Sequence, residues 1–233
     1  MSAQQLEIAA EVLGPLIEEV VFVGGATVHL WLTDPGAPPA RATDDVDAIC
    51  EVASRTEYYR LEAKLRERGL REATEEEVIC RWRSDDPPLV LDLMPTDPDI
   101  LGFSNEWYEE AIATAAVVRL DSSAEIRVAT PPLLVATKLC AWKGRGDGDL
   151  LGSLDVHDVL TLIDGRPELA QEVEAAPPHL RSYIQNELAE LQAEPYFSYA
   201  VDGATATYGP VGAERARLVR ERIDELVTAR GPA

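Results

Sequence analysis

Two short apolar runs, each stopped by turn-forming residues, constrain the fold most strongly. Residues 20–23 read Val-Val-Phe-Val and end at Gly24-Gly25, and residues 89–94 form a second run that ends at Pro95. Short runs that are rich in β-branched and apolar residues and bounded by glycine or proline are typical of buried strands. Further extended segments are expected at 45–48, 78–83, 116–120 and 125–128. The first half of the chain is therefore predicted to form a sheet.

Helical spacing dominates the second half of the chain. After Thr130-Pro131-Pro132 the apolar residues recur at helical positions, which predicts helices over 132–143, 154–164, 168–193 and 212–229. The same spacing predicts helices in the first half over 4–20, with Gly14-Pro15 as a candidate break, and over 26–32, 54–68 and 104–115. We expect an α+β fold whose structural type changes near residue 128.

The acidic composition limits the classes of partner. The chain has 233 residues and a formal net charge of −21, from 42 acidic and 21 basic residues. Such a surface repels nucleic acid at long range, which argues against nonspecific DNA binding but leaves room for RNA in a local basic pocket. No apolar run approaches the ~20 residues that span a bilayer, and the N-terminus lacks the pattern of a signal peptide. We expect a cytoplasmic protein without membrane contact.

Three aspartates, far apart in sequence, carry the chemical signal. Asp45 and Asp47 alternate with apolar residues, so on a strand both side chains point to one face, roughly 6–7 Å apart. Asp92 interrupts the apolar run 89–94, where a buried and unpaired carboxylate is costly. A neighbouring strand that brings Asp92 beside the pair would complete a site for hard divalent cations, which prefer oxygen ligands. We therefore predict that these carboxylates bind two Mg²⁺ (or Mn²⁺) ions.

Two such ions suit phosphoryl transfer from a nucleoside triphosphate. One ion orients the α-phosphorus, the other activates an acceptor hydroxyl, and Asp92 is predicted to help bind the second ion and accept the proton. Gly24-Gly25 lack Cβ atoms, so their backbone N–H groups can approach a phosphate closely. Each feature has an ordinary structural alternative: the glycines form a simple turn, and Asp45 and Asp47 a solvated strand edge. Their combination in this order favours the functional interpretation.

The order of these motifs resembles one enzyme superfamily. Gly24-Gly25, then Arg41-x-Thr43-x-Asp45-x-Asp47, then Asp92 in an apolar strand are similar to the DNA polymerase β-type nucleotidyltransferases, and most similar to the AbiEii-type toxin nucleotidyltransferases of type IV toxin–antitoxin systems. A helical segment with Lys138, followed by Asp155-Val156-His157-Asp158, extends the resemblance over about residues 20–165. The resemblance implies a nucleotidyltransferase mixed β-sheet flanked by helices in a catalytic domain, residues 1–128. It also implies a helical C-terminal region, residues 129–233, that completes the nucleotide cleft.

The resemblance also assigns roles to individual residues. The metal ligands would be Asp45, Asp47 and Asp92. The nucleotide would contact Gly24, Gly25, Thr43, Lys138 and Asp155. From the residues alone, Lys138 lies in an otherwise apolar helix and must either pair with a carboxylate such as Asp155 or bind an anion. Both interpretations of Lys138 stay open.

Several functions are compatible with this pattern. The leading prediction is transfer of a nucleoside monophosphate from an NTP to an acceptor hydroxyl or phosphate, with release of pyrophosphate. The toxin resemblance implies an RNA or tRNA end as the acceptor, whereas antibiotic-modifying enzymes suggest a small molecule, and a protein hydroxyl is a further alternative. Without catalysis, the chain would be a nucleotide-binding protein, or half of a toxin–antitoxin pair whose acidic surface binds a basic antitoxin.

Overall fold

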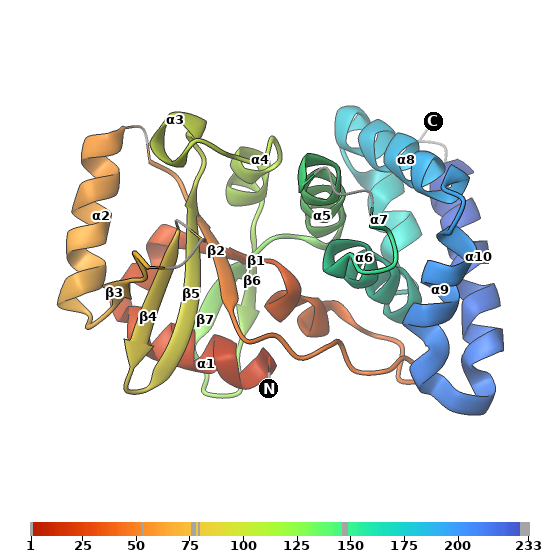
Figure 1. Ribbon diagram of the computed structural model, residues 1–233, viewed down its shortest axis with the longest axis horizontal. Helices are drawn as coiled ribbons and strands as arrows, with labels where there is room; N and C mark the ends of the chain where they lie inside the picture. Colours follow the sequence, from red (N-terminus) through yellow and green to blue (C-terminus); the bar gives the residue numbers. More distant parts are fainter. Residues whose placement is uncertain (1, 53, 76–77, 79, 146–148, 229–233) are drawn as a thin grey trace. The chain divides into compact units, whose positions relative to one another are not determined.

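The computed structural model describes residues 2–52, 54–75, 78, 80–145 and 149–228 (Figure 1). The chain divides into two compact units. The first unit contains residues 1–29 and 41–130, and the second contains residues 30–40 and 131–233. The chain therefore changes unit between Thr130 and Pro131, and the segment 30–40 belongs with the second unit.

A mixed sheet forms the centre of the first unit. In the described part of the chain it has seven strands in the order β3-β4-β5-β2-β1-β7-β6. Their bounds are β1 Val20–Val23, β2 Val46–Cys50, β3 Arg71–Glu72, β4 Arg81–Asp85, β5 Pro88–Pro95, β6 Ala116–Arg119 and β7 Glu125–Val128. β2 pairs with β5 and β1 with β7 in parallel, and the other neighbours are antiparallel. This α+β architecture with flanking helices confirms the general fold class expected from the sequence.

Alternation along β2 and β5 places Asp47 and Asp92 on one face of the sheet and their apolar neighbours Ala48 and Leu93 on the other. The register pairs Ala48 with Leu93, and both side chains are fully buried. Because successive side chains point to opposite faces, the neighbouring residues Asp47 and Asp92 emerge on the other side. The apolar core therefore lies behind the carboxylates.

Short helices flank the sheet in the first unit. They are α1 Ser2–Leu13, α2 Arg55–Glu67, α3 Pro98–Leu101, α4 Tyr108–Ala113 and the 3₁₀ helices η1 Gly14–Glu19 and η2 Gly25–Trp31, which runs into the second unit. Ser54 caps α2, as predicted, by accepting a 3.3 Å hydrogen bond from the Glu57 N–H. The helix predicted over 4–20 is broken at the candidate position Gly14-Pro15: α1 ends at Leu13, and Gly14 has a φ of +54°.

Three predictions in the first unit need correction or restriction. The segment 26–32 is mainly 3₁₀ rather than α-helical. The helix predicted over 104–115 is too long, because Asn105 forms a turn in which its Oδ1 accepts from the Trp107 N–H at 3.1 Å. The strand predicted over 78–83 begins only at Arg81, and its residue 79 lies outside the described residues.

The described part of the second unit is helical. Its helices are α5 Pro131–Arg145, α6 Leu154–Gly165, α7 Leu169–Ala175, α8 Pro178–Ala193, α9 Phe197–Thr205, η3 Ala206–Val211 and α10 Gly212–Thr228. The single helix predicted over 168–193 is wrong, because Pro177-Pro178 cannot continue a helix and separates α7 from α8. We did not predict α9, and the predicted end of the last helix at 229 lies outside the described residues. Among the helices that the structure describes, none has both the length and the apolar character to cross a membrane.

Buried charges attach the segment 30–40 to the second unit. Asp34 Oδ2 accepts a 2.8 Å hydrogen bond from Arg215 Nη1 of α10. Arg215 Nη2 donates to the Asp164 carbonyl of α6 at 2.8 Å, and its side chain is only 12% exposed. A charge at this depth needs such partners, because burial without them is costly. The arginine thus joins the segment to two helices.

Removing the Arg215 guanidinium should destabilise the second unit. In Arg215→Met the Asp34 carboxylate loses its closest cation while it stays largely buried, and breaking one partner of such a pair costs about 3 kcal/mol. Arg217→Met is the matched control, because Arg217 lies on the same helix in an exposed pair with Glu221. Urea unfolding should show a loss of about 3 kcal/mol for the first variant and less than about 0.5 kcal/mol for the second. Equal losses would contradict this role of Arg215.

Candidate functional site

Two of the predicted carboxylates lie on adjacent strands at the same level. The parallel pairing of β2 with β5 sets Asp47 opposite Asp92, so both side chains leave the same face of the sheet. Asp92 is buried and Asp47 is half-buried. Asp45, also half-buried, immediately precedes β2. The register alone therefore aligns residues that are 45 positions apart in the sequence.

An arginine that the sequence analysis did not identify joins Asp45 to Asp92. Arg81 of β4 is the antiparallel neighbour of Asp92. Its Nε donates to Asp92 Oδ1 at 2.8 Å and its Nη2 to Asp92 Oδ2 at 2.8 Å. The same Nη2 donates to Asp45 Oδ2 at 2.9 Å. The structure thus joins Asp45 and Asp92 through one guanidinium, and the register places Asp47 beside Asp92 on the same face.

The pairing of Arg81 with Asp92 is indicated in the sequence by the hairpin turn between the two strands. Asp85 pairs with Pro88 across the two-residue turn Asp86-Pro87. Counting back along this hairpin from the turn sets Arg81 opposite Asp92. The acidic and proline-rich turn between the two extended segments was therefore sufficient to propose the pair, once both segments were assigned to one hairpin.

Gly24 has no room for a side chain, because Asp47 lies against it. Gly24 follows β1 with a φ of +75°, and a Cβ atom at this position would lie 1.9 Å from Asp47 Oδ2. Its carbonyl accepts hydrogen bonds from the N–H of Thr27 at 3.2 Å and from the Thr27 hydroxyl at 2.9 Å, which hold the turn. Gly25 begins η2 and is buried. The glycine turn and the carboxylates are thus parts of one local structure.

Thr43 places a buried hydroxyl close in sequence to the carboxylates. It is 6% exposed and precedes Asp45 by two residues. Its Oγ1 has no hydrogen-bond partner among the residues that the structure describes. A buried hydroxyl without a partner is unfavourable, and a ligand that supplies one recovers the lost free energy. Thr43 is therefore a candidate ligand contact on geometric grounds as well as by resemblance.

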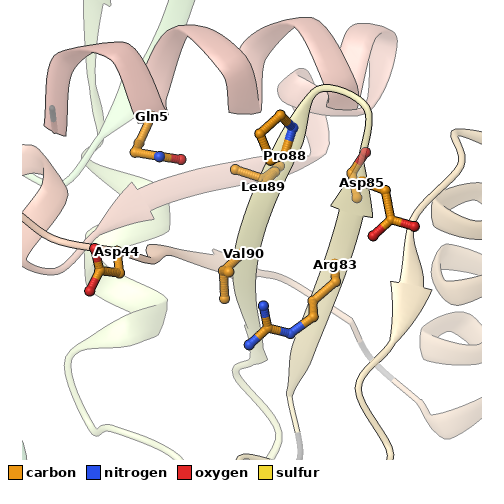
Figure 2. A pocket seen from close by; sticks show the side chains of 8 residues that line it. Gln5, Asp44, Arg83, Asp85, Pro88, Leu89 and Val90 are labelled. Atoms are coloured by element: carbon orange, nitrogen blue, oxygen red, sulfur yellow. The ribbon is translucent and has the colours of Figure 1, made fainter.

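A hollow of about 340 Å³ lies beside the β4–β5 hairpin (Figure 2). Asp44, Arg83 of β4 and Val90 of β5 are among the residues that line it.

Asp44 is exposed, whereas the next residue, Asp45, bonds to Arg81. Two consecutive carboxylates therefore have different surroundings, which makes Asp44 a matched control for the acidic cluster.

The thiol of Cys80 lies within the electrostatic influence of the cluster. Burial, followed by the charges of Asp92 and Asp47, raises the pKa of the Cys80 thiol to about 12. Burial also raises the pKa of the free Cys50 thiol to about 12. Thiols with such pKa values stay protonated at neutral pH, when they are poor nucleophiles and poor metal ligands. These thiols therefore do not compete with the carboxylates as the candidate chemical groups.

In the second unit, Lys138 of α5 pairs with two carboxylates of α6. Its Nζ lies 3.0 Å from Asp155 Oδ1 and 2.8 Å from Asp158 Oδ2, and all three side chains are buried. This is the carboxylate pairing that the sequence left open, and it accounts for the burial of the lysine without a ligand. A contact of Lys138 or Asp155 with a nucleotide stays a prediction.

The metal-binding prediction meets one obstacle in this arrangement. Within the described ranges, no group of three or more His, Cys, Asp or Glu side chains is placed to hold a metal ion. Arg81 supplies a physical reason, because its Nη2 contacts an oxygen of Asp45 and an oxygen of Asp92. The donor set itself consists of carboxylate oxygens, which hard divalent cations prefer. The residues therefore fit Mg²⁺ or Mn²⁺ in chemistry, on condition that the guanidinium withdraws.

Comparison with known proteins does not identify a function for the chain. No protein-family model and no curated protein matched the chain. The structure brings together Gly24, Gly25, Asp45, Asp47 and Asp92 in the first unit, which also contains Thr43. The function is therefore inferred from what these residues can do chemically.

Replacing Gly24 tests how closely the turn and Asp47 are packed. Gly24→Ala introduces both an unfavourable φ and a clash with the Asp47 carboxylate. Gly102→Ala is the matched control, because Gly102 has a φ of +80° with no atom within 4 Å of its added Cβ. We expect Gly24→Ala to lower the unfolding free energy by about 2 kcal/mol or more, and Gly102→Ala by about 1 kcal/mol.

The same packing predicts a specific rescue. In the Asp47→Ala background the contacts with Oδ2 at 1.9 Å and Cγ at 2.6 Å are removed and only the Cβ contact at 2.7 Å is left, so the cost of Gly24→Ala should fall towards that of Gly102→Ala without reaching it. Urea unfolding of the double variant measures this difference. If the cost of Gly24→Ala is unchanged without the Asp47 carboxylate, the two residues are not in the contact described.

Proposed function

We propose that the chain is a metal-dependent nucleotidyltransferase, which moves a nucleoside monophosphate from an NTP to an acceptor and releases pyrophosphate. One observation carries the proposal: Asp47 and Asp92 lie side by side on one face of the sheet, with Asp45 joined to Asp92 through Arg81 and Gly24 packed against Asp47. Carboxylates placed so close repel each other unless a cation lies among them. An acidic cluster beside a backbone turn without side chains suits a cation that carries a phosphate.

The proposed metal ligands are Asp45, Asp47 and Asp92, with Mg²⁺ or Mn²⁺ as the cation. When bound, divalent ions would supply charge neutralisation for the triphosphate and lower the pKa of the acceptor hydroxyl. Asp47 extends from β2 and Asp92 from β5, and rigid strands hold ligands in place before the ion arrives. This positioning is what the protein itself contributes to metal binding.

The remaining residues of the first unit would orient the nucleotide. The backbone N–H groups at Gly24 and Gly25 would donate to phosphate oxygens, next to the Asp47 carboxylate that packs against Gly24. The unpaired Thr43 hydroxyl would donate to the nucleotide as well. Restricting the motion of the triphosphate in this way favours in-line attack.

The transfer step follows from these positions. The acceptor oxygen forms a bond to the α-phosphorus while the bond from that phosphorus to the bridging oxygen breaks, and pyrophosphate leaves with the electron pair. The acceptor proton passes to a carboxylate oxygen of Asp92, which is buried and fixed by its strand. Backbone dipoles of the glycine turn would stabilise the charge that develops on the phosphate oxygens.

The resemblance to the DNA polymerase β-type nucleotidyltransferases, and to the AbiEii-type toxins among them, supports this proposal. It predicts the nucleotidyltransferase fold for residues 1–128 and adds Lys138 and Asp155 as nucleotide contacts. It also favours an RNA or tRNA end as the acceptor and a cognate antitoxin as a partner. The net charge of −21 disfavours RNA at long range, so a small molecule or a protein hydroxyl remains an alternative acceptor.

A second candidate function is nucleotide binding without catalysis. The observation that favours it is the Arg81 guanidinium, which satisfies Asp45 and Asp92 without a metal ion. The two candidates differ in a measurable way, because only the enzyme incorporates label from an NTP into another molecule.

Replacement of Asp47 tests the proposed activity. Purified protein is incubated with labelled NTPs, Mg²⁺ or Mn²⁺ and total RNA, and label is followed in RNA, in protein and in small molecules. Asp47→Ala should lower incorporation on the order of 10³-fold because one metal ligand is lost, with the fold retained since carboxylate repulsion decreases. The matched control Asp44→Ala should transfer at the wild-type rate. Undiminished transfer by Asp47→Ala would remove Asp47 from the site, and absence of transfer by the wild type would favour the binding protein.

Replacement of Thr43 tests the nucleotide contact. Thr43→Val removes the unpaired hydroxyl, so the unfolding free energy should stay within about 0.5 kcal/mol of wild type while the KM for the NTP rises about fivefold. Thr205→Val is the contrasting control, because the buried Thr205 hydroxyl donates to the Val201 carbonyl at 3.0 Å. It should lose about 1 kcal/mol of stability without a change in KM. An unchanged KM in Thr43→Val would place Thr43 outside the nucleotide site.

A further inference from the structure

The Arg81 guanidinium occupies the carboxylate oxygens that a cation would use. Its Nη2 donates to Asp92 Oδ2 at 2.8 Å and to Asp45 Oδ2 at 2.9 Å, so one nitrogen contacts both carboxylates. Its Nε takes the other oxygen of Asp92 at 2.8 Å. A cation shared by Asp45 and Asp92 would bind the same oxygens, at the distances of about 2.0–2.1 Å that Mg²⁺ requires. The guanidinium and the cation therefore exclude each other.

The charges of the three groups favour an exchange. Asp45 and Asp92 together carry two negative charges when ionised, and Arg81 offsets one of them. A divalent ion in the same place offsets both, and the interaction strengthens with the charge of the ion. Replacing the guanidinium by a divalent ion breaks the bidentate contact between Arg81 and Asp92, and such contacts are among the stronger hydrogen-bonded ion pairs. Arg81 therefore opposes metal binding without preventing it.

The position of Arg81 gives its guanidinium access to solvent. Its side chain is 17% exposed, and that of its partner Asp45 is 39% exposed. Arginine can swing its charged end towards water while its strand stays in place. Asp92, whose side chain is 9% exposed, is held by β5 and stays in position. Displacement of the Arg81 guanidinium would free the oxygens of Asp45 and Asp92 that it contacts.

We propose that Arg81 is an internal counter-ion of the carboxylate site, which holds Asp45 and Asp92 without metal and is displaced when a divalent cation binds. The inference rests on the proposed function, since it takes Asp45, Asp47 and Asp92 as metal ligands. Arg81 then has two opposite effects. It stabilises the metal-free fold by offsetting carboxylate repulsion, and it weakens metal binding because an ion pair must first break.

Metal titration of β4 variants tests this inference. Calorimetric titration with Mn²⁺ alone compares the wild-type chain with Arg81→Met and Arg83→Met. Arg83→Met is the matched control, since it removes the same charge from the same strand, but Arg83 pairs with Val90 and not with Asp92 in the register. Arg81→Met should bind Mn²⁺ about tenfold more tightly or better, as expected when a neighbouring positive charge is removed. Arg83→Met should stay within about threefold of wild type.

Thermal unfolding gives a second readout that does not depend on transfer activity. In EDTA, Arg81→Met should unfold at a lower temperature than wild type and Arg83→Met, because its carboxylates repel each other. Millimolar Mg²⁺ should raise the Tm of Arg81→Met more than that of wild type, since a tighter ligand stabilises the folded state more. Arg81→Gln keeps N–H donors without the charge, and it replaces the Met variant if that variant does not fold.

The possible failures are distinguishable. Equal or weaker Mn²⁺ binding by Arg81→Met, relative to a wild type that binds, would overturn the counter-ion inference and leave the metal site standing. Absence of Mn²⁺ binding from the wild type and from both variants would overturn the proposed function together with the inference.

Discussion

The parallel pairing of β2 with β5 is the constraint on which the candidate site depends. Its register sets Asp47 opposite Asp92 and, one residue along, buries Ala48 against Leu93 on the reverse face. A shift of one residue in either strand would turn a carboxylate into the core and an apolar side chain towards solvent. The free energy that buries the apolar face therefore also holds the carboxylates together.

Carboxylates that lie close together repel each other, and an arginine on the neighbouring strand reduces this repulsion. Arg81 of β4 contacts Asp92 and Asp45, and its guanidinium offsets part of their negative charge. On the other side, Gly24 provides the space that the Asp47 side chain fills. The site is thus stable as a set of mutually dependent contacts, and the same contacts determine how readily a cation can enter it.

Buried charges of the second unit are also paired with groups of opposite charge. Lys138 lies between Asp155 and Asp158, and Arg215 joins Asp34 to the carbonyl of Asp164. Lys138 of α5 thereby joins its helix to α6, and Arg215 of α10 has partners on the segment 30–40 and on α6. Such networks favour one arrangement of helices, because any other leaves a charge without a partner.

Much of the fold could be predicted from local patterns. The strands at 20–23 and 89–94 and the Ser54 cap depend on neighbours in sequence, so their residues indicate them directly. The error over 168–193 arose because helical spacing was given more weight than Pro177-Pro178, although proline is tolerated in the first turn of a helix and disrupts its interior. The alignment of Asp47 with Asp92 was only a hypothesis, since periodicity does not specify which strands become neighbours.

The sequence by itself determined the α+β character, the position of Asp47 and Asp92 on strands and the absence of side chains at the glycine turn, because these follow from residue type and spacing. Tertiary structure alone decided which groups meet. It placed Arg81 between Asp45 and Asp92, left the buried Thr43 hydroxyl without a partner among the described residues, and paired Lys138 with Asp155. These contacts depend on strand register and helix packing, which are set by burial of the whole core and not by any one segment.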